Sequence, residues 1–241
     1  MIVKKTNARR FISSYNNIDN ALRAQYNYKR SLPFSDVLKK SVPMNSIVRK
    51  YEDELIDYSR LRNAIVHGGD EDNPIAEPHI EVVNKIEYIE KLITTSPRAL
   101  DYFKKDVITL SPNCSLKSAI NLMAKNGFAN LPVYENVGKN GKNLLGIVNA
   151  QKLIEVIGNT MYNVDEFLEN TNLGEFLEVA NSKYYDVVPS NISLQEILDR
   201  FYKNRKLLVI IITEEGKETG NPLGIVTVGD IMDINNTLDN Y

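Results

Sequence analysis

The sequence predicts an α+β protein in which an N-terminal α-helical bundle is followed by a duplicated β-α-β-β-α module. Three observations support this fold class. Apolar residues recur at helical spacing through the first hundred residues, short β-branched runs appear only afterwards, and the second half repeats itself at a constant offset of 78 residues. We expect one domain over residues 1–98 and a second over 99–241.

Composition places the 241-residue chain among globular proteins, with 43% hydrophobic and 25% charged residues. No apolar run approaches the roughly 18 residues of a transmembrane helix, and no apolar segment of a secretory signal follows the basic N-terminus. The single Cys114 excludes an internal disulfide and fits a reducing compartment. We therefore expect a cytoplasmic protein with no membrane partner.

Charge is distributed unevenly along the chain, whose net charge is −2. Residues 1–50 hold eleven Lys and Arg against two Asp and Glu. A local basic surface can attract phosphate groups, although solvated helix faces are the alternative interpretation.

The N-terminal half is expected to form several helices with short connectors, which favours a small bundle. The first apolar stripe consists of Phe11, Tyr15, Ile18, Leu22 and Tyr26. After a Ser-Leu-Pro break at 31–33, a segment from Asn45 to His67 carries Ile47, Tyr51, Leu55, Tyr58, Leu61 and Ile65 at the same spacing. A further helix carries Val82, Ile86, Ile89 and Ile93.

The second half is a repeat, expected at residues 105–157 and 181–236 with connecting helices at 158–180. Matching positions include Ser115 with Ser193 and Val133 with Ile211, and Gly146-Ile147-Val148 matches Gly224-Ile225-Val226. Ser193 and Glu196 have the spacing of a capping box that opens a helix. Since one copy leaves a sheet face uncovered, the two copies are expected to pack on each other.

The repeated segments, VITLSPNCSLKSAINLMAKNGFANLPVYEN and DVVPSNISLQEILDRFYKNRKLLVIIITEEG, each followed by LGIV, resemble a tandem pair of CBS domains. This resemblance implies a module with two clefts and an adenine nucleotide as regulatory ligand, without a required cofactor. In the family, a G-h-h-T-x-x-D segment places a hydroxyl and a carboxylate at the cleft. The second copy matches it with Gly224, Thr227 and Asp230.

The first copy departs from this motif, with Asn149 at the Thr position and Lys152 at the Asp position. A lysine cannot accept hydrogen bonds from ribose but can contact a phosphate, so we expect two unequal clefts. The better ligand site is then the one around Thr227 and Asp230, with the backbone of Val187 and Val188 on its adenine side. The alternative is that Thr227 and Asp230 only cap the following helix.

The segment LRNAIVHGGD, residues 61–70, carries the other candidate site. Asn63 and His67 lie four residues apart, hence on one helical face, and the Gly-Gly pair places His67 in the last turn. Arg62, Asn63 and His67 match the R-[polar]-x(n)-H motif of the HEPN family, which residues 8–95 resemble. The resemblance implies a homodimer in which two motifs face each other and cleave RNA without a metal.

In that chemistry Arg62 would hold phosphate oxygens, His67 would transfer a proton, and Asn63 would orient His67 or a phosphate oxygen. Two alternatives remain open: an inactive bundle that binds RNA or a nucleotide, and a pure dimer scaffold. No metal site is expected, because the acidic residues at 70–72 have no further ligands at suitable spacing.

The sequence thus predicts a regulatory protein in which a CBS pair, on binding an adenine-type nucleotide, controls a dimeric HEPN-like domain that is a candidate metal-independent endoribonuclease. The alternative is a non-enzymatic nucleotide-sensing or dimerisation module with an inactive HEPN-like domain.

Overall fold

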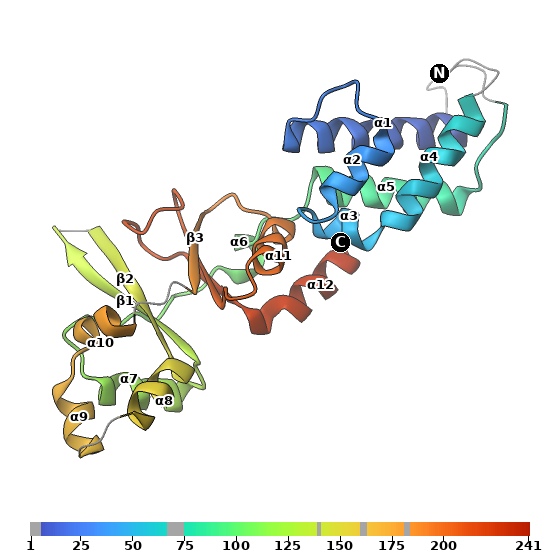
Figure 1. Ribbon diagram of the computed structural model, residues 1–241. Helices are drawn as coiled ribbons and strands as arrows, with labels where there is room; N and C mark the ends of the chain where they lie inside the picture. Colours follow the sequence, from blue (N-terminus) through green and yellow to red (C-terminus); the bar gives the residue numbers. More distant parts are fainter. Residues whose placement is uncertain (1–5, 67–74, 139–140, 160–162, 181–183) are drawn as a thin grey trace. The chain divides into compact units, whose positions relative to one another are not determined.

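The computed structural model describes residues 6–66, 75–138, 141–159, 163–180 and 184–241 (Figure 1). Contacts divide the chain into two compact units. The first comprises Met1–Pro97, Ser193–Lys203 and Met232–Tyr241, and the second comprises Arg98–Ile192 and Asn204–Ile231. Two helices of the second sequence repeat therefore belong to the same unit as the N-terminal helices.

In the described residues of its N-terminal part, the first unit contains five helices. They are α1 (Asn7–Tyr26), α2 (Phe34–Ser41), α3 (Ser46–Lys50), α4 (Glu52–Val66) and α5 (Ile80–Thr94). Helix α1 packs against α2, α4 and α5. Of the predicted stripe of α1, Phe11, Tyr15, Ile18 and Leu22 are buried, whereas Tyr26 at the end of the helix is half-buried. On the neighbouring face, Arg10 forms an ion pair of 2.6 Å with Glu87 of α5.

The long helical segment predicted from Asn45 onwards is in fact two helices. The Asn45 side chain caps α3 by accepting a hydrogen bond from the Val48 backbone, and α3 ends after five residues. Tyr51 has φ −114° and ψ 25°, outside the helical region, while its ring is buried. Helix α4 starts at the next residue, so the helix is interrupted at Tyr51 while the Tyr51 side chain stays buried.

The buried face of α5 differs in part from the predicted one. Ile86 and Ile89 are buried as expected, but the flanking buried residues are Val83 and Leu92. Val82 and Ile93 are only half-buried. Because the segment has apolar residues at adjacent positions, spacing alone was compatible with either face.

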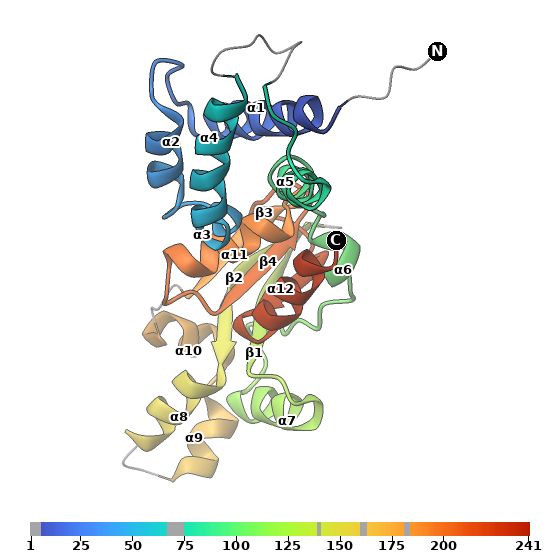
Figure 2. The same ribbon diagram turned by 90° about the vertical axis from the view of Figure 1, so that its right-hand side faces the viewer.

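The first unit is completed by α11 (Leu194–Lys203) and α12 (Ile231–Asp239). Helix α11 begins with the predicted capping box: the Ser193 N–H donates to Glu196 Oε2 at 2.9 Å, and the Glu196 N–H donates to Ser193 Oγ at 3.2 Å. It packs against α3 (Figure 2). At the far end of α12, the Tyr88 hydroxyl of α5 donates to the Leu238 carbonyl at 2.6 Å.

The second unit holds two small sheets. In the first, β1 (Asn130–Val137) pairs with β2 (Gly141–Asn149) as an antiparallel hairpin. In the second, β3 (Tyr185–Pro189) is parallel to β4 (Val209–Thr213), which is antiparallel to β5 (Gly224–Thr227). The helices of this unit are α6 (Leu100–Phe103), α7 (Leu116–Asn126), α8 (Ala150–Gly158), α9 (Val164–Asn170) and α10 (Leu173–Ala180).

The repeat is visible in the order of elements, with one difference. The second copy has the predicted strand, helix, strand, strand and helix, whereas the first strand of the first copy is reduced to a parallel bridge between Leu110 and Val133. The two copies share a core, as predicted: Tyr134 and Ile147 of the first copy pack with Val209 and Ile211 of the second.

Within the described residues, no helix is both long and apolar enough to cross a lipid bilayer.

Candidate functional site

A cavity of about 340 Å³ lies in the second unit, around the end of β5. Ile225 and Thr227 of β5 line it together with Asp230, which follows in a short 3₁₀ turn (Val228–Asp230). The opposite walls come from the first copy. They are formed by the backbone segment 105–108 and by residues 127–132, between α7 and β1. The cavity is therefore built from both sequence repeats.

Thr227 and Asp230 contact each other directly. The Asp230 Oδ2 atom accepts hydrogen bonds from the Thr227 backbone N–H at 2.6 Å and from the Thr227 hydroxyl at 2.8 Å. These bonds complete a capping box at the start of the 3₁₀ turn that leads into α12. The predicted capping role is thus present. Because a carboxylate can accept about four hydrogen bonds, Asp230 keeps capacity for a ligand.

Gly224 does not line this cavity but positions one of its walls. A Cβ atom at Gly224 would lie 2.5 Å from the Phe103 carbonyl oxygen, a distance that requires a shift of the backbone. The absence of a side chain lets the chain after α6 approach β5, where Lys104 bridges Gly224 and the Lys105 N–H donates to Leu223 O at 3.3 Å. Gly224 therefore has a supporting role in this structure, and its contact with a ligand stays a prediction.

Val187 and Val188 do not reach the cavity either. Both lie in β3, which is separated from β5 by β4. Val188 is fully buried, and Val187 lines a different hollow with Tyr185 and Lys217. The position assigned to their backbone is taken by segment 105–108 of the first copy. This segment lies between two bridges, from Lys104 to Gly224 of β5 and from Leu110 to Val133 of β1. It therefore runs along the cavity between those two strands.

A second cavity, of about 510 Å³, surrounds Asn149 and Lys152. Its other lining residues are Gln151, Glu155, Tyr184, Lys206 and Leu208. The 78-residue offset relates the second cavity to the first. In the second cavity the first copy supplies the motif residues, and the second copy supplies the opposite wall. Asn149 and Lys152 correspond to Thr227 and Asp230, while Lys206 corresponds to Phe128.

The second cavity differs from the first in charge. Asn149 caps α8 by accepting from the Lys152 N–H at 3.1 Å, and it donates to Asn130 Oδ1 at 2.8 Å. The Lys152 ammonium forms an ion pair of 2.8 Å with Glu155. Burial raises the pKa of Tyr184 to about 12, so its phenol stays neutral and donates to the Ile147 carbonyl at 2.7 Å. Two lysines thus stand where the first cavity has a carboxylate and an aromatic ring.

Comparison with known proteins agrees with this duplicated architecture. Residues 99–159 and 178–235 match the CBS domain family. The chain carries a tandem pair of CBS domains.

Three solved structures illustrate the likeness of the CBS pair. The CBS domain of a bacterial CNNM/CorC family Mg²⁺ transporter, in complex with ATP, has 16% identity and a TM-score of 0.44 over 63% of this chain and 96% of that chain. CBSX2 in complex with AMP has 16% identity and a TM-score of 0.45 over 59% and 98%. A CBS-domain containing protein from Agrobacterium tumefaciens has 19% identity and a TM-score of 0.42 over 56% and 89%.

Several residues of the first CBS cavity were missed in the sequence. Lys105 and Asp106 are exposed at one wall, Phe128 is 38% exposed at another, and Asn130 begins β1. These residues lie before the Asn149–Lys152 motif of the first copy, and their residue types match no motif. The duplication could have indicated them, because in a pair of repeats the cavity at the motif of one copy can take its opposite wall from the other copy.

The Arg62 motif lies in the first unit, near the end of α4. Asn63 is exposed, and Arg62 is half-buried. The Arg62 Nε atom is buried and has no hydrogen-bond partner in the part of the chain that the structure describes. His67 lies outside the described residues, as do the acidic residues at 70–72. Among the described residues, no group of three or more His, Cys, Asp or Glu side chains could hold a metal ion.

Proposed function

We propose that the CBS pair binds an adenine nucleotide in the cavity around Thr227 and Asp230, and that occupancy regulates the helical part of the protein. One observation carries this proposal: a hydroxyl and a carboxylate meet at the edge of a cavity that also holds an exposed aromatic ring and a lysine. The CBS family resemblance implies the same pair of residues.

Each group of the cavity suits one part of a nucleotide. Asp230 would accept hydrogen bonds from the two ribose hydroxyls, because a charged acceptor strengthens such bonds. Phe128 and Ile225 offer apolar surface for the base. Lys105 is exposed, has no ion pair among the described residues, and can approach a phosphate as a point charge. The ATP and AMP complexes of solved CBS structures supply the first ligands to test.

Helix α12 offers a physical route from this cavity to the helical part. Asp230 directly precedes α12, and a ligand that takes hydrogen bonds from Thr227 or Asp230 competes with their capping box. The other end of α12 contacts the N-terminal helices: Tyr88 donates to Leu238, and the Lys91 ammonium donates to the Tyr241 carbonyl at 2.7 Å. A change in the first turn of α12 is therefore expected to alter these contacts.

Thermal unfolding with AMP and with ATP tests the proposal. At about 100 times its dissociation constant, a ligand adds about 2.7 kcal/mol to the free energy of unfolding, a readily measured shift. Asp230→Ala should abolish the shift. Asp233→Ala is the matched control, because Asp233 is an exposed carboxylate in the first turn of α12 that does not line the cavity. Equal shifts in wild type and Asp230→Ala would disprove the site.

A second candidate function, metal-independent endoribonuclease activity of a homodimer, is favoured by the unpartnered Nε of Arg62. Because this Nε atom is buried, the terminal nitrogens of the half-buried guanidinium are the donors that would contact a phosphate oxygen. The protein should then cut single-stranded RNA in the presence of EDTA, and Arg62→Gln or His67→Ala should abolish cutting. If neither variant reduces cutting, or if wild type does not cut, the HEPN-like part is a non-enzymatic module.

A further inference from the structure

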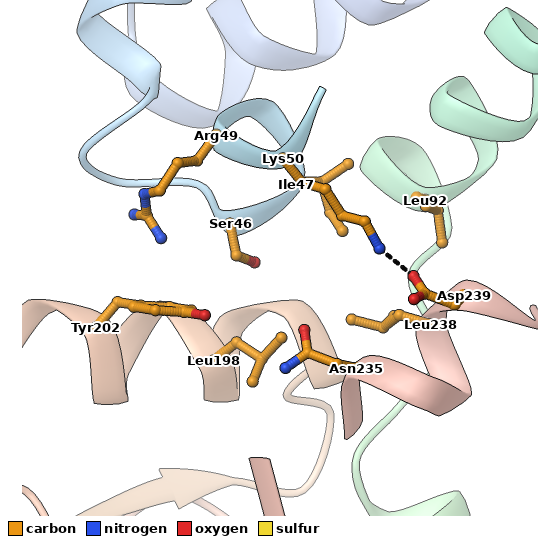
Figure 3. A pocket seen from close by; sticks show the side chains of 10 residues that line it. All are labelled: Ser46, Ile47, Arg49, Lys50, Leu92, Leu198, Tyr202, Asn235, Leu238 and Asp239. Carbon is orange, nitrogen blue, oxygen red and sulfur yellow. Dashed lines mark hydrogen bonds and ion pairs between the residues drawn. The ribbon is translucent and has the colours of Figure 1, made fainter. Parts of the chain in front are cut away.

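The first unit contains a separate cavity of about 260 Å³ between α3, α11 and α12 (Figure 3). Its lining residues are Ser46, Ile47, Arg49, Lys50, Leu92, Leu198, Tyr202, Asn235, Leu238 and Asp239. We propose that this cavity is a second ligand site, which takes a small organic molecule bearing one oxyanion group, a carboxylate or a phosphate. The proposal does not depend on the nucleotide site.

Arg49 is the receptor for the oxyanion. Its Nε atom donates to the Val42 carbonyl at 3.1 Å, and its guanidinium lies 4.6 Å from the centroid of the Tyr202 ring. These two contacts hold the planar group in place. Its two terminal nitrogens have no hydrogen-bond partner among the described residues, and Figure 3 shows them directed into the space above Tyr202. A fixed guanidinium with free parallel donors binds carboxylate and phosphate through two hydrogen bonds.

Arg49 forms no ion pair among the described residues, although the buried carboxylate of Asp199 lies near enough to interact with its charge. Lys50 and Asp239 form an ion pair with each other at the rim (Figure 3). The carboxylate of Asp199 accepts a hydrogen bond from the Ser46 backbone N–H at 2.6 Å and is buried, outside the lining. The Ser46 hydroxyl is buried beside the Asp199 carboxylate, whose pKa it helps to lower, so Arg49 is the group left to receive an anion. The lining thus has one guanidinium without an ion pair among the described residues, which favours an anion.

The size and apolar lining of the cavity restrict the ligand. The apolar lining includes the buried side chains of Ile47, Leu92, Leu198 and Leu238. The ring of Tyr202 is 51% exposed and forms an apolar wall. A volume of 260 Å³ is slightly below the range of about 300–1,000 Å³ for drug-sized ligands. A single ring or a short aliphatic chain with one charged group fits these limits.

Binding here would bridge α3 with α11 and α12. Since α3 belongs to the N-terminal helices and α11 and α12 belong to the second CBS copy by sequence, the ligand would stabilise their association. The full-length protein should therefore unfold at a higher temperature with such a ligand.

Benzoate, phenyl phosphate and the uncharged benzamide test the proposal, because all three carry the same ring. Thermal unfolding and ligand-observed NMR at millimolar concentrations should detect benzoate, phenyl phosphate or both, but not benzamide. Preference for one anion identifies its class. Arg49→Gln should weaken binding by about tenfold or more, as expected for loss of charge-assisted hydrogen bonds. Arg60→Gln, an exposed arginine on α4, is the matched control and should bind as wild type does.

Asp230→Ala should leave this binding unchanged, which separates it from the nucleotide site. If circular dichroism shows that Arg49→Gln is unfolded, Tyr202→Leu replaces it, since loss of the ring removes the support of the guanidinium and should also weaken binding. Absence of binding by both anions, equal binding of benzamide, or undiminished binding by a folded Arg49→Gln protein would each overturn the proposal.

Discussion

The carboxylate of Asp199 in α11 accepts a hydrogen bond of 2.6 Å from the backbone N–H of Ser46, the first residue of α3. Asp199 is only 5% exposed. Burial raises the pKa of Asp199 to about 6, although the Ser46 N–H and the charges of Lys203 and Arg49 lower it in part. A buried acid thus joins a helix of the second CBS copy to the N-terminal helices, and its charge state should affect their association.

The pH dependence of stability should reveal this carboxyl. A folded-state pKa above the unfolded value means that the folded protein binds the proton more tightly, so the free energy of unfolding rises as pH falls from about 7 to about 4. The shift from 3.8 to about 6 corresponds to roughly 3 kcal/mol. In Asp199→Asn this rise should vanish. Chemical unfolding across this pH range measures it.

Asp233→Asn serves as the control for that experiment, because Asp233 is exposed. The informative quantity is the difference between wild type and variant as a function of pH, since the new amide also introduces buried donors. A difference that is constant between about pH 3.5 and about pH 7.5, a range that includes both pKa values, would show that Asp199 does not titrate there.

Gly224→Ala should destabilise the second unit. The new Cβ would lie 2.5 Å from the Phe103 carbonyl oxygen, and relief requires the wall of the nucleotide cavity to move. We expect a loss of about 1–3 kcal/mol, typical of overpacking, together with weaker binding of AMP or ATP. Gly158→Ala in α8 is the control: no atom lies within 4 Å of its added Cβ, and stability should be unchanged or higher. Equal stability of the two variants would contradict the close approach.

Lys152→Asp combined with Asn149→Thr should create a second nucleotide site. These changes reproduce in the 510 Å³ cavity the Thr and Asp of the first cavity. Calorimetric titration with AMP should then give a higher stoichiometry than wild type. Gln151→Asp adds a carboxylate to the same cavity at a position without a counterpart in the motif, and should not raise the stoichiometry. A gain in that variant alone would indicate that the position of the carboxylate is irrelevant.

Tyr88→Phe should loosen the end of α12. The phenol of Tyr88 stays neutral, since burial raises the pKa of Tyr88 to about 12, and it donates to the Leu238 carbonyl at 2.6 Å. Loss of one hydrogen bond is worth about 0.5–1.5 kcal/mol, and amide exchange in α12 should become faster. Tyr102→Phe changes an exposed ring and is expected to leave α12 unaffected. Unchanged exchange in Tyr88→Phe would show that this bond does not hold the helix.

Local patterns in the sequence predicted those features that depend on neighbouring residues. The stripe from Phe11 to Leu22 identified α1, and the Ser193–Glu196 spacing identified the capping box of α11, because both follow from the geometry of a single helix. The 78-residue offset identified the duplication, because each copy repeats the same order of elements.

Features that depend on distant contacts were not predictable in this way. The cavity around Thr227 takes its walls from segment 105–108, whose course is decided by a bridge between Lys104 and Gly224. Nothing in the sequence distinguishes the buried Asp199 from the exposed Asp233, because burial is decided by α3 packing on α11. The break at Tyr51 likewise reflects the packing of its ring, which helical spacing does not encode.

The membership of α11 and α12 in the first unit has a consequence for dividing the polypeptide. A cut at residue 98 would follow the domain boundary that the sequence suggests. It would also expose the buried side chains of Leu198 and Leu238 and remove the Ser46 N–H that donates to Asp199. Fragments that end or start there should aggregate more readily than the intact polypeptide, because they expose apolar surface. Gene fusions that carry only the CBS pair, residues 99–241, should have the same weakness.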